Sequence, residues 1–276
     1  MPYVKLVYLG TPAMAVPPLR ALVAAGHEVV LVITRVDKRR GRGSGVSPSP
    51  VKAAALELGL PVSHDVDDAI VAAQEQDAEL GVVVAFGQII KPNVLDVLPM
   101  VNLHFSLLPR WRGAAPVERA LLAGDQVTGV CVMALEEGLD TGGVHARREV
   151  PIGPETTAAE LREQLVNVGT QLLVDTLAEP LGEPEPQVGE VTHAAKFSSA
   201  DFEIDWSRPA PEIHRLIRVG GAWTTFRGKR LKINAARLVD GAVRPETVQP
   251  EGKAPMSFDA WRNGARPAAD ELFSAL

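Results

Sequence analysis

Residues 4–34 read VKLVYLGTPAMAVPPLRALVAAGHEVVLVIT, with an apolar run on either side of a helix-like stretch. Val4–Leu9 and Val29–Thr34 are continuously apolar, which is typical of strands buried on both faces. Pro17–Ala25 lies between them and stops at Gly26, a residue typical of helix ends. Buried strands that alternate with helices predict a mostly parallel sheet covered by helices, a Rossmann-like α/β fold.

The same alternation continues to about residue 180. Further strands are predicted at Leu80–Phe86, Val101–Phe105, Val127–Leu135 and Val144–Val150. Further helices are predicted at Val51–Leu58, Ala115–Ala123 and Ala158–Leu177. Thr156 or Thr157 is suited to cap the last of these helices.

A second, smaller unit follows a linker. Ala178–Thr192 is acidic and rich in Pro and Gly, which indicates a break in the fold. Beyond it the sequence predicts a helix at Pro211–Arg218, strands at Ala222–Arg227 and Arg230–Ala235, and then turns and a polar tail. We therefore expect one domain over residues 1–180, a linker over 181–199 and a β-rich domain over 200–276.

Composition narrows the class of protein. The chain has 276 residues, 46% of them hydrophobic and 22% charged, which excludes a disordered, collagen-like or coiled-coil protein. Cys131 is the single cysteine, so an internal disulfide is excluded and a reducing cytoplasm is favoured. The six histidines show no metal-ligand spacing, so no metal is expected. The N-terminus lacks a signal-peptide pattern and no apolar run is long enough to cross a bilayer.

The net charge of -6 hides an uneven distribution. Residues 35–52 carry +5 and residues 206–237 carry +7, so the rest of the chain carries -18. Two basic segments on an acidic body indicate a polyanionic partner held at two places, although each is also compatible with an ordinary solvated face. Residues 35–50 form a long Gly-, Ser- and Arg-rich loop, which is either a solvated loop or a functional one. Trp223 and Phe226 lie in the second segment, where they would stack on bases or belong to a small core.

The stretch NLHFSLLPRWRGAAP, residues 102–116, concentrates polar side chains suited to chemistry. Asn102 and His104 are two apart on a predicted strand, so they point the same way at its carboxyl end, where open α/β sheets bind ligands. A carboxamide and an imidazole aimed at one point are suited to a developing oxyanion. Asp140, in the later stretch EGLDTGG, would orient the imidazole and relay a proton.

Three other enzyme classes fit the sequence less well. Asp140-Thr-Gly142 resembles the aspartic protease motif, but that chemistry needs a second such carboxylate. A Gly-x-Ser-x-Gly elbow is missing, which argues against a serine hydrolase. Gly10-Thr-Pro12 after the first strand lacks the glycine spacing of a dinucleotide-binding loop.

Together these stretches resemble the folate-dependent formyltransferases, and most closely the branch that acts on methionyl-tRNA. The resemblance rests on Asn102-x-His104, on Ser106–Pro116 and on Leu139–Gly142. Further matching stretches are Gly10–Pro12, Gly41–Gly43, Pro48–Lys52, Val83–Gly87, Ile204–Trp206 and Gln249–Lys253. The likeness thus covers nearly the whole chain.

The resemblance implies transfer of a formyl group from 10-formyltetrahydrofolate to the α-amino group of methionine on initiator tRNA. It implies Asn102, His104 and Asp140 as catalytic residues. It implies a folate site formed by Phe86, Gly87, Ser106, Leu107, Leu108 and Pro109. It implies tRNA contacts from Arg39, Arg40, Arg42, Arg227, Lys229 and Arg230. We expect a cytoplasmic monomer with tRNA and folate as partners and no membrane.

The sequence departs from the family pattern in two places. Phe105 replaces a small Gly between the histidine and the serine. The second domain is short, because residues 238–247 run directly into the terminal motif, so we expect an OB-like β-barrel that lacks several strands. A formyltransferase for an amino-sugar nucleotide or another small amine, and a tRNA-binding relative without turnover, are the alternatives.

Overall fold

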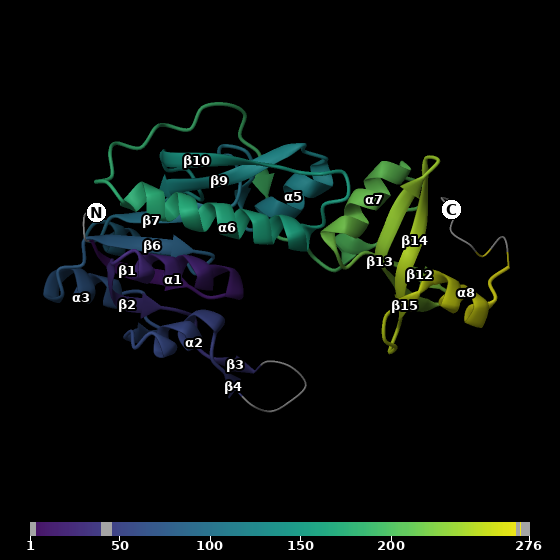
Figure 1. The fold of residues 1–276 in the computed structure, drawn as a ribbon, viewed down its shortest axis with the longest axis horizontal. Helices are drawn as coiled ribbons and strands as arrows, with labels where there is room; N and C mark the ends of the chain where they lie inside the picture. The colour runs from purple at the N-terminus through teal and green to yellow at the C-terminus, as the bar shows by residue number, and fades with distance from the viewer. Residues whose placement is uncertain (1–3, 40–45, 269–270, 272–276) are drawn as a thin grey trace. The chain divides into compact units, whose positions relative to one another are not determined.

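The computed structural model describes residues 4–39, 46–268 and 271 (Figure 1). They form two compact units, each assembled from separate stretches of sequence. The first unit comprises the residues up to Gly113, Thr128–Val150 and Glu163–His193. The second unit comprises Ala114–Val127, Pro151–Arg162 and the residues from Ala194 onward. Both units therefore draw on sequence from either side of residue 180.

The first unit is built on a seven-stranded sheet of the order β10-β9-β7-β6-β1-β2-β5. The strands are β1 (Lys5–Gly10), β2 (Glu28–Ile33), β5 (Val62–Ser63), β6 (Leu80–Val84), β7 (Met100–His104), β9 (Val127–Ala134) and β10 (Val144–Pro151). Strand β1 pairs in parallel with β2 and β6, β2 with β5, and β6 with β7, whereas β7 and β9 are antiparallel. The predicted mostly parallel sheet is confirmed.

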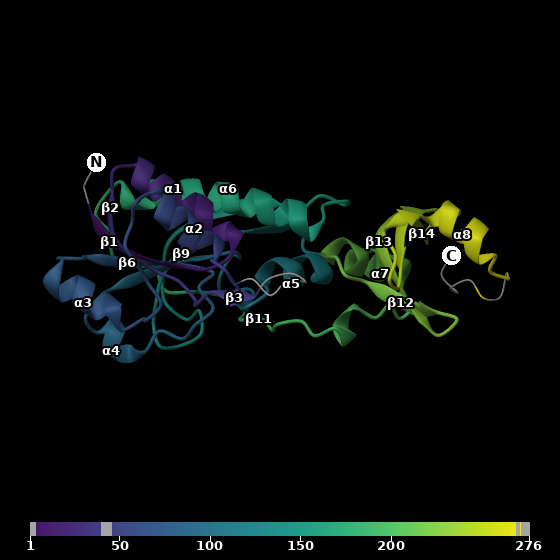
Figure 2. The same ribbon diagram turned by 90° about the horizontal axis from the view of Figure 1, so that it is seen from below.

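Helices cover both faces of this sheet. They are α1 (Val16–Ala24), α2 (Pro50–Glu57), α3 (Asp68–Glu75), α4 (Pro92–Leu95) and α6 (Ala158–Leu177). Figure 2 shows α1, α2 and α6 on one side of the sheet and α3 and α4 on the other. Burial on both sides explains why strands such as β6, buried at every position, read as continuous apolar runs.

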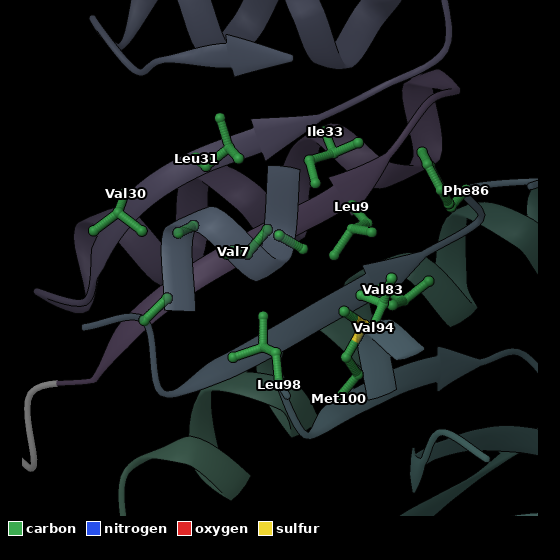
Figure 3. Close-up of a cluster of buried hydrophobic side chains, with 13 residues drawn as sticks. Val7, Leu9, Val30, Leu31, Ile33, Val83, Phe86, Val94, Leu98 and Met100 are labelled. Carbon is green, nitrogen blue, oxygen red and sulfur yellow. The ribbon is translucent and has the colours of Figure 1, made fainter. Parts of the chain in front are cut away.

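Figure 3 shows the core on the α3 and α4 side. Val7 and Leu9 of β1, both fully buried, meet Val83 of β6 and Val94 of α4 there. Strand β1 lies between β2, which follows it in the chain, and β6, which comes later. Such a change of direction opens a crevice at the carboxyl ends of the strands, where α/β sheets bind ligands.

Helix α6 begins where the sequence predicts. The Thr157 hydroxyl accepts the Glu160 amide at 3.3 Å, and the Glu160 carboxylate accepts the Thr157 amide at 2.9 Å. This reciprocal capping box satisfies two backbone donors at the helix start. Of the two candidate caps, Thr157 is therefore the one that the structure uses.

The basic loop of the first unit is partly described. It contains the short strands β3 (Lys38–Arg39) and β4 (Val46–Ser47), which pair antiparallel. Arg40 and Arg42, two of the predicted tRNA contacts, lie outside the described residues, as does the side chain of Arg39. Lys52, counted in the same basic segment, is ion-paired with Asp37 at 2.7 Å.

The second unit contains a four-stranded antiparallel sheet in the order β12-β13-β14-β15. The strands are β12 (Trp223–Phe226), β13 (Lys229–Val239), β14 (Ala242–Pro250) and β15 (Met256–Ser257), and the helices are α5 (Pro116–Ala123), α7 (Ala210–Val219) and α8 (Phe258–Ala265). Ile217, Ile233, Val248 and Trp261 are among its buried core residues. The predicted small β-rich unit is confirmed. It includes two strands, β14 and β15, and a helix, α8, where we expected turns and a polar tail.

Four short elements complete the described chain. They are the 3-10 helices η1 (Ala13–Ala15) and η2 (Ala200–Phe202) and the two-residue strands β8 (Arg112–Gly113) and β11 (His193–Ala194). In the described part of the chain, none of the helices has the length and apolar character that a membrane crossing requires.

Candidate active site

The candidate site is centred on the end of β7. Asn102 and His104 are two residues apart on this strand, so their side chains lie on the same face of the sheet. Leu103 between them lies beside Gly169 of α6, on the opposite face. The predicted common direction of the carboxamide and the imidazole therefore follows from the strand register.

His104 is held by oxygen atoms at both ring nitrogens. Its side chain is 5% exposed, and Nε2 donates to the carbonyl of Trp111 at 2.9 Å. Its Nδ1 faces Oδ2 of Asp140 at 3.7 Å, an ion-pair distance. A carbonyl can only accept, so this contact fixes the hydrogen on Nε2. The predicted use of His104 as an oxyanion donor therefore requires that the Trp111 bond be exchanged for one to the substrate.

Asp140 lies in the loop between β9 and β10, as the sequence predicts. Its carboxylate is nearly buried, and Oδ2 accepts the backbone N–H of Gly113 at 2.7 Å. The residue has φ +51°, a left-handed conformation that a non-glycine residue adopts at a cost of about 1 kcal/mol or more. Trp111, which holds His104, has φ +63°. Backbone strain of this kind is typical of functional sites.

Among the described residues, the Asn102 side chain has no hydrogen-bond partner, unlike His104 and Asp140. Its side chain is half-buried, and within the described part of the chain its carboxamide makes no hydrogen bond. A half-buried amide next to a buried imidazole and carboxylate is a donor that remains available for a ligand.

The residues expected to line the folate site fall into two groups. Ser106 and Leu108 are buried; the serine hydroxyl donates to the carbonyl of Arg110 at 2.6 Å, and Leu108 packs against Cys131. Phe86 is part of the first unit's core, and Pro109 is buried. Of these six residues, only two are accessible to solvent: Gly87, which is exposed, and Leu107, which is half-buried. Burial also raises the pKa of the Cys131 thiol, so this cysteine has a structural place in the core.

Most of the basic residues in segment 206–237 are engaged within the second unit. Five of the eight have carboxylate or carbonyl partners there: Arg208 with Glu212, Arg215 with Leu122, Arg218 with Gly153 and Thr156, Arg227 with Glu271, and Arg237 with Glu246. The Arg227 guanidinium lowers the pKa of Glu271 to about 2 through this hydrogen bond. Arg227, a predicted tRNA contact, is thus already paired.

Three cations of this segment have no ion-pair partner among the described residues: Lys229, Arg230 and Lys232. All three are exposed on β13, and the Arg230 guanidinium lies 3.9 Å from the centre of the Trp223 ring. Phe226, by contrast, packs edge-on against Trp261 in the core. Within segment 206–237, the available positive charge is therefore concentrated at the β12–β13 hairpin.

The sequence interpretation missed two residues near the site, Gln187 and Thr192. Both lie in the stretch that we expected to be a linker. Gln187 donates to the carbonyls of Asp140 and Gly142, and the Thr192 hydroxyl accepts the Trp111 amide at 2.9 Å. These contacts join positions 45 to 81 residues apart in the sequence, so local spacing gives no signal of them.

Comparison with known proteins identifies the family. The family model described as formyl transferase matches residues 4–177, and the model for the formyl transferase C-terminal domain matches residues 196–242. A methionyl-tRNA formyltransferase from Roseobacter denitrificans is 46% identical over 258 residues, covering 89% of this chain and 84% of the relative. The chain belongs to the methionyl-tRNA formyltransferase family. The resemblance read from the sequence is confirmed.

A second relative bears on the length of the chain. The methionyl-tRNA formyltransferase from Symbiobacterium thermophilum is 41% identical over an alignment of 310 residues, which covers 98% of this chain and 95% of the relative. Because the alignment is longer than this chain, the relative carries residues that have no counterpart here.

Among solved structures, HypX from Aquifex aeolicus in complex with tetrahydrofolic acid shares the fold. It superposes with a TM-score of 0.67 at 15% sequence identity, over 95% of this chain and 47% of HypX. At this identity the likeness bears on the fold alone.

Proposed function

We propose that this enzyme transfers the formyl group of 10-formyltetrahydrofolate to the α-amino group of methionine on initiator Met-tRNA, giving N-formylmethionyl-tRNA. The observation that carries the proposal is the Asn102 carboxamide, which has no internal partner among the described residues, beside His104 and Asp140, which contact one another. Membership of the methionyl-tRNA formyltransferase family supports the choice of acceptor.

The three side chains supply what formyl transfer to an amine requires. Asn102 donates a hydrogen bond to the formyl oxygen as negative charge develops there. His104 adds a second donor after exchanging its bond with Trp111. Asp140 keeps His104 oriented and takes the proton that the attacking amine loses, directly or through water. This proton passes to N10 of the folate as the bond between N10 and the formyl carbon breaks, so tetrahydrofolate leaves as a neutral amine.

The folate donor fits the accessible residues beside this set. Gly87 and Leu107 would contact it through their exposed atoms, whereas Phe86, Ser106, Leu108 and Pro109 would do so through main-chain groups, because their side chains are buried. HypX from Aquifex aeolicus, which shares the fold, binds tetrahydrofolic acid in its crystal structure, and this supports a folate site.

We infer that the first unit performs the chemistry and that the second unit helps to hold the RNA. Lys229, Arg230 and Lys232 supply phosphate-binding charge, and the stacked Arg230–Trp223 pair offers a surface for a base. In this proposal the enzyme works as a monomer in the cytoplasm, where its two substrates meet. Its predicted domain limits, 1–180 and 200–276, stay a proposal.

The test is a formylation assay. Incubation of the wild-type chain with 10-formyltetrahydrofolate and charged initiator tRNA should yield formylmethionine, detected after mild hydrolysis of the ester. Turnover on an amino-sugar nucleotide or another small amine, with none on Met-tRNA, would favour the alternative acceptor. A folded protein without turnover on either would contradict an enzymatic role.

Asn102→Ala should lower kcat by on the order of 10²–10³-fold, because one oxyanion donor is lost. Its fold should be retained, since the carboxamide has no partner in the described chain to leave unsatisfied. Steady-state formylation together with thermal unfolding checks both points, with Asn93→Ala, an exposed asparagine on α4, as the control. Wild-type kcat in a folded Asn102→Ala protein would remove this residue from the mechanism.

Simultaneous replacement of Lys229 and Arg230 by alanine should weaken tRNA binding and make it less sensitive to salt. If each cation meets one phosphate, the slope of log K against log salt concentration becomes shallower by about 1.4–1.8 for the pair. Arg237→Ala is the matched control, because Arg237 is exposed but already paired with Glu246 at 2.7 Å. Filter binding across a range of salt concentrations measures both slopes, and equal slopes for the pair variant and the wild type would exclude this surface.

A further inference from the structure

Gln187 lies in the stretch expected to be a linker, yet its side chain is fully engaged in the first unit. Its Nε2 donates to the carbonyl of Asp140 at 2.9 Å and to the carbonyl of Gly142 at 2.8 Å. Its Oε1 accepts from Nε and Nη2 of Arg112 at 3.0 and 2.7 Å. The orientation of the amide follows from chemistry, because carbonyls only accept and a guanidinium only donates.

These bonds connect the two loops that meet at the candidate site. One loop carries Asp140, and the other carries Arg112 and Gly113. The Gly113 amide donates to the Asp140 carboxylate, so Gln187 closes a ring of hydrogen bonds that runs from Asp140 through Arg112 and Gly113 back to Asp140. The ring therefore fixes Asp140 at two points, its main-chain carbonyl and its carboxylate.

The conformation of Asp140 explains why it needs this support. With φ +51° its backbone is in the left-handed region, which aspartate tolerates better than most non-glycine residues but still at a cost that its contacts must offset. Gln187 binds the carbonyl of Asp140 itself and that of Gly142, two residues on. The amide therefore holds the strained turn at two points.

The segment that bears Gln187 is itself anchored on the far side of the site. The Thr192 carbonyl accepts the Arg112 amide at 2.9 Å, and the Thr192 hydroxyl accepts the Trp111 amide at 2.9 Å. Trp111 in turn holds His104 through its carbonyl. Residues 187–192 thus contact the backbone next to both His104 and Asp140.

We propose that Gln187 is a positioning residue of the formyl-transfer reaction, which acts by fixing the Asp140 carboxylate against His104. The proposal rests on the proposed function. It assigns no contact between Gln187 and substrate, and it predicts a loss in kcat rather than in substrate binding.

Two variants separate the hydrogen bonds that the Gln187 amide accepts from those that it donates. Gln187→Leu keeps the size of the side chain and removes every hydrogen bond. Gln187→Glu still accepts from Arg112 but has no N–H for the two carbonyls. Both should lower kcat by about 10–100-fold, with KM for tRNA and for the folate within about threefold of wild type. Gln171→Ala, at an exposed glutamine on α6 whose side chain donates to Asp175, is the matched control and should be unchanged.

A double-mutant cycle tests the route of the effect. If Gln187 acts through Asp140, Gln187→Leu should cost less than about threefold when added to Asp140→Asn, measured by single-turnover formylation at high enzyme concentration. A full 10–100-fold further loss in the Asp140→Asn background would show that the two residues act independently, and would overturn the proposal.

Amide exchange provides a readout that does not depend on activity. In Gln187→Leu, protection of the Gly113 amide, which bonds the Asp140 carboxylate, should fall at least tenfold, while protection of the Cys131 amide in β9 stays at the wild-type level. Unchanged Gly113 protection would overturn the proposal, whatever the acceptor. An inactive wild type with a loosened Gly113 amide in the variant would instead refute the proposed function and leave the positioning of Asp140 by Gln187 supported.

Discussion

Asp140→Asn is expected to lower kcat by on the order of 10³–10⁴-fold while the protein stays folded, as when the carboxylate that orients a catalytic imidazole becomes an amide. The asparagine Oδ1 can still accept the Gly113 N–H, which Asp140 accepts at 2.7 Å. The negative charge opposite Nδ1 of His104, at 3.7 Å, is lost, so the imidazole loses the carboxylate that orients it. Single-turnover formylation of charged initiator tRNA measures the rate, and circular dichroism measures the fold.

Asp140→Ala separates the structural part of this role from the chemical part. It removes the charge and also leaves the part-buried Gly113 N–H without a partner, at a cost of about 1–3 kcal/mol in unfolding free energy. The alanine variant should therefore be as inactive as the asparagine variant but less stable. Asp96→Asn, an exposed carboxylate that follows α4, is the control and should match wild type in both respects. Turnover within about threefold of wild type in a folded Asp140→Asn protein would exclude Asp140 from the chemistry.

Many regular elements of the first unit were predictable because their ends carry local signals, but β5, α3 and α4 were not predicted. The strand expected at Val4–Leu9 is Lys5–Gly10, the helix expected at Pro17–Ala25 is Val16–Ala24, and Ala158–Leu177 has the predicted bounds. Glycines, prolines and a capping Thr-x-x-Glu mark these boundaries in the sequence itself. Shifts of one residue arise because the terminal turns depend on hydrogen bonds to neighbouring elements.

Strand β14 was not predicted, although the local sequence contains a signal for it. The dipeptide Asp240-Gly241 joins β13 to β14, with φ +51° and +79°, the conformation of a two-residue hairpin turn. Asp-Gly between apolar residues is a strong hairpin signal, so this strand could have been predicted from the sequence. Pro245, however, lies inside β14. Because proline cannot donate a hydrogen bond to a neighbouring strand, its presence in the sequence argues against a strand there.

The proposed catalytic trio could be predicted from the sequence more fully than the available positive charge could. Asn102 and His104 follow from strand period, and Asp140 follows from the family motif. The pairing of Arg227 with Glu271, 44 residues away, cannot be read from composition, and it reduces the charge available to RNA. The contacts of Gln187 could not be predicted from the sequence either, because they depend on how distant loops fold together.

Gly142→Ala is expected to destabilise the first unit more than any exposed substitution. A Cβ at Gly142 would lie 2.0 Å from the carbonyl oxygen of Ala134 and 2.9 Å from its carbonyl carbon. These are main-chain atoms of β9, held by pairing with β7 and by the Ala134 amide, which donates to Gly143 at 2.8 Å. Because neither can move without disrupting the pairing of β9, the loss in unfolding free energy should reach about 3 kcal/mol or more.

The same clash couples stability to chemistry. Gly142 follows Asp140 by two residues and its carbonyl accepts from Gln187, so displacing it moves the strained turn that sets the Asp140 carboxylate. Gly142→Ala should therefore lose activity even at temperatures where it remains folded, whereas Gly182→Ala, with nothing within 4 Å of its Cβ and an ordinary φ, should change the unfolding free energy by less than about 0.5 kcal/mol. Urea unfolding and formylation assays on both variants decide the matter. If the two variants were equally stable, β9 and this loop would separate at little cost. The close approach of these two segments would then not require glycine at position 142.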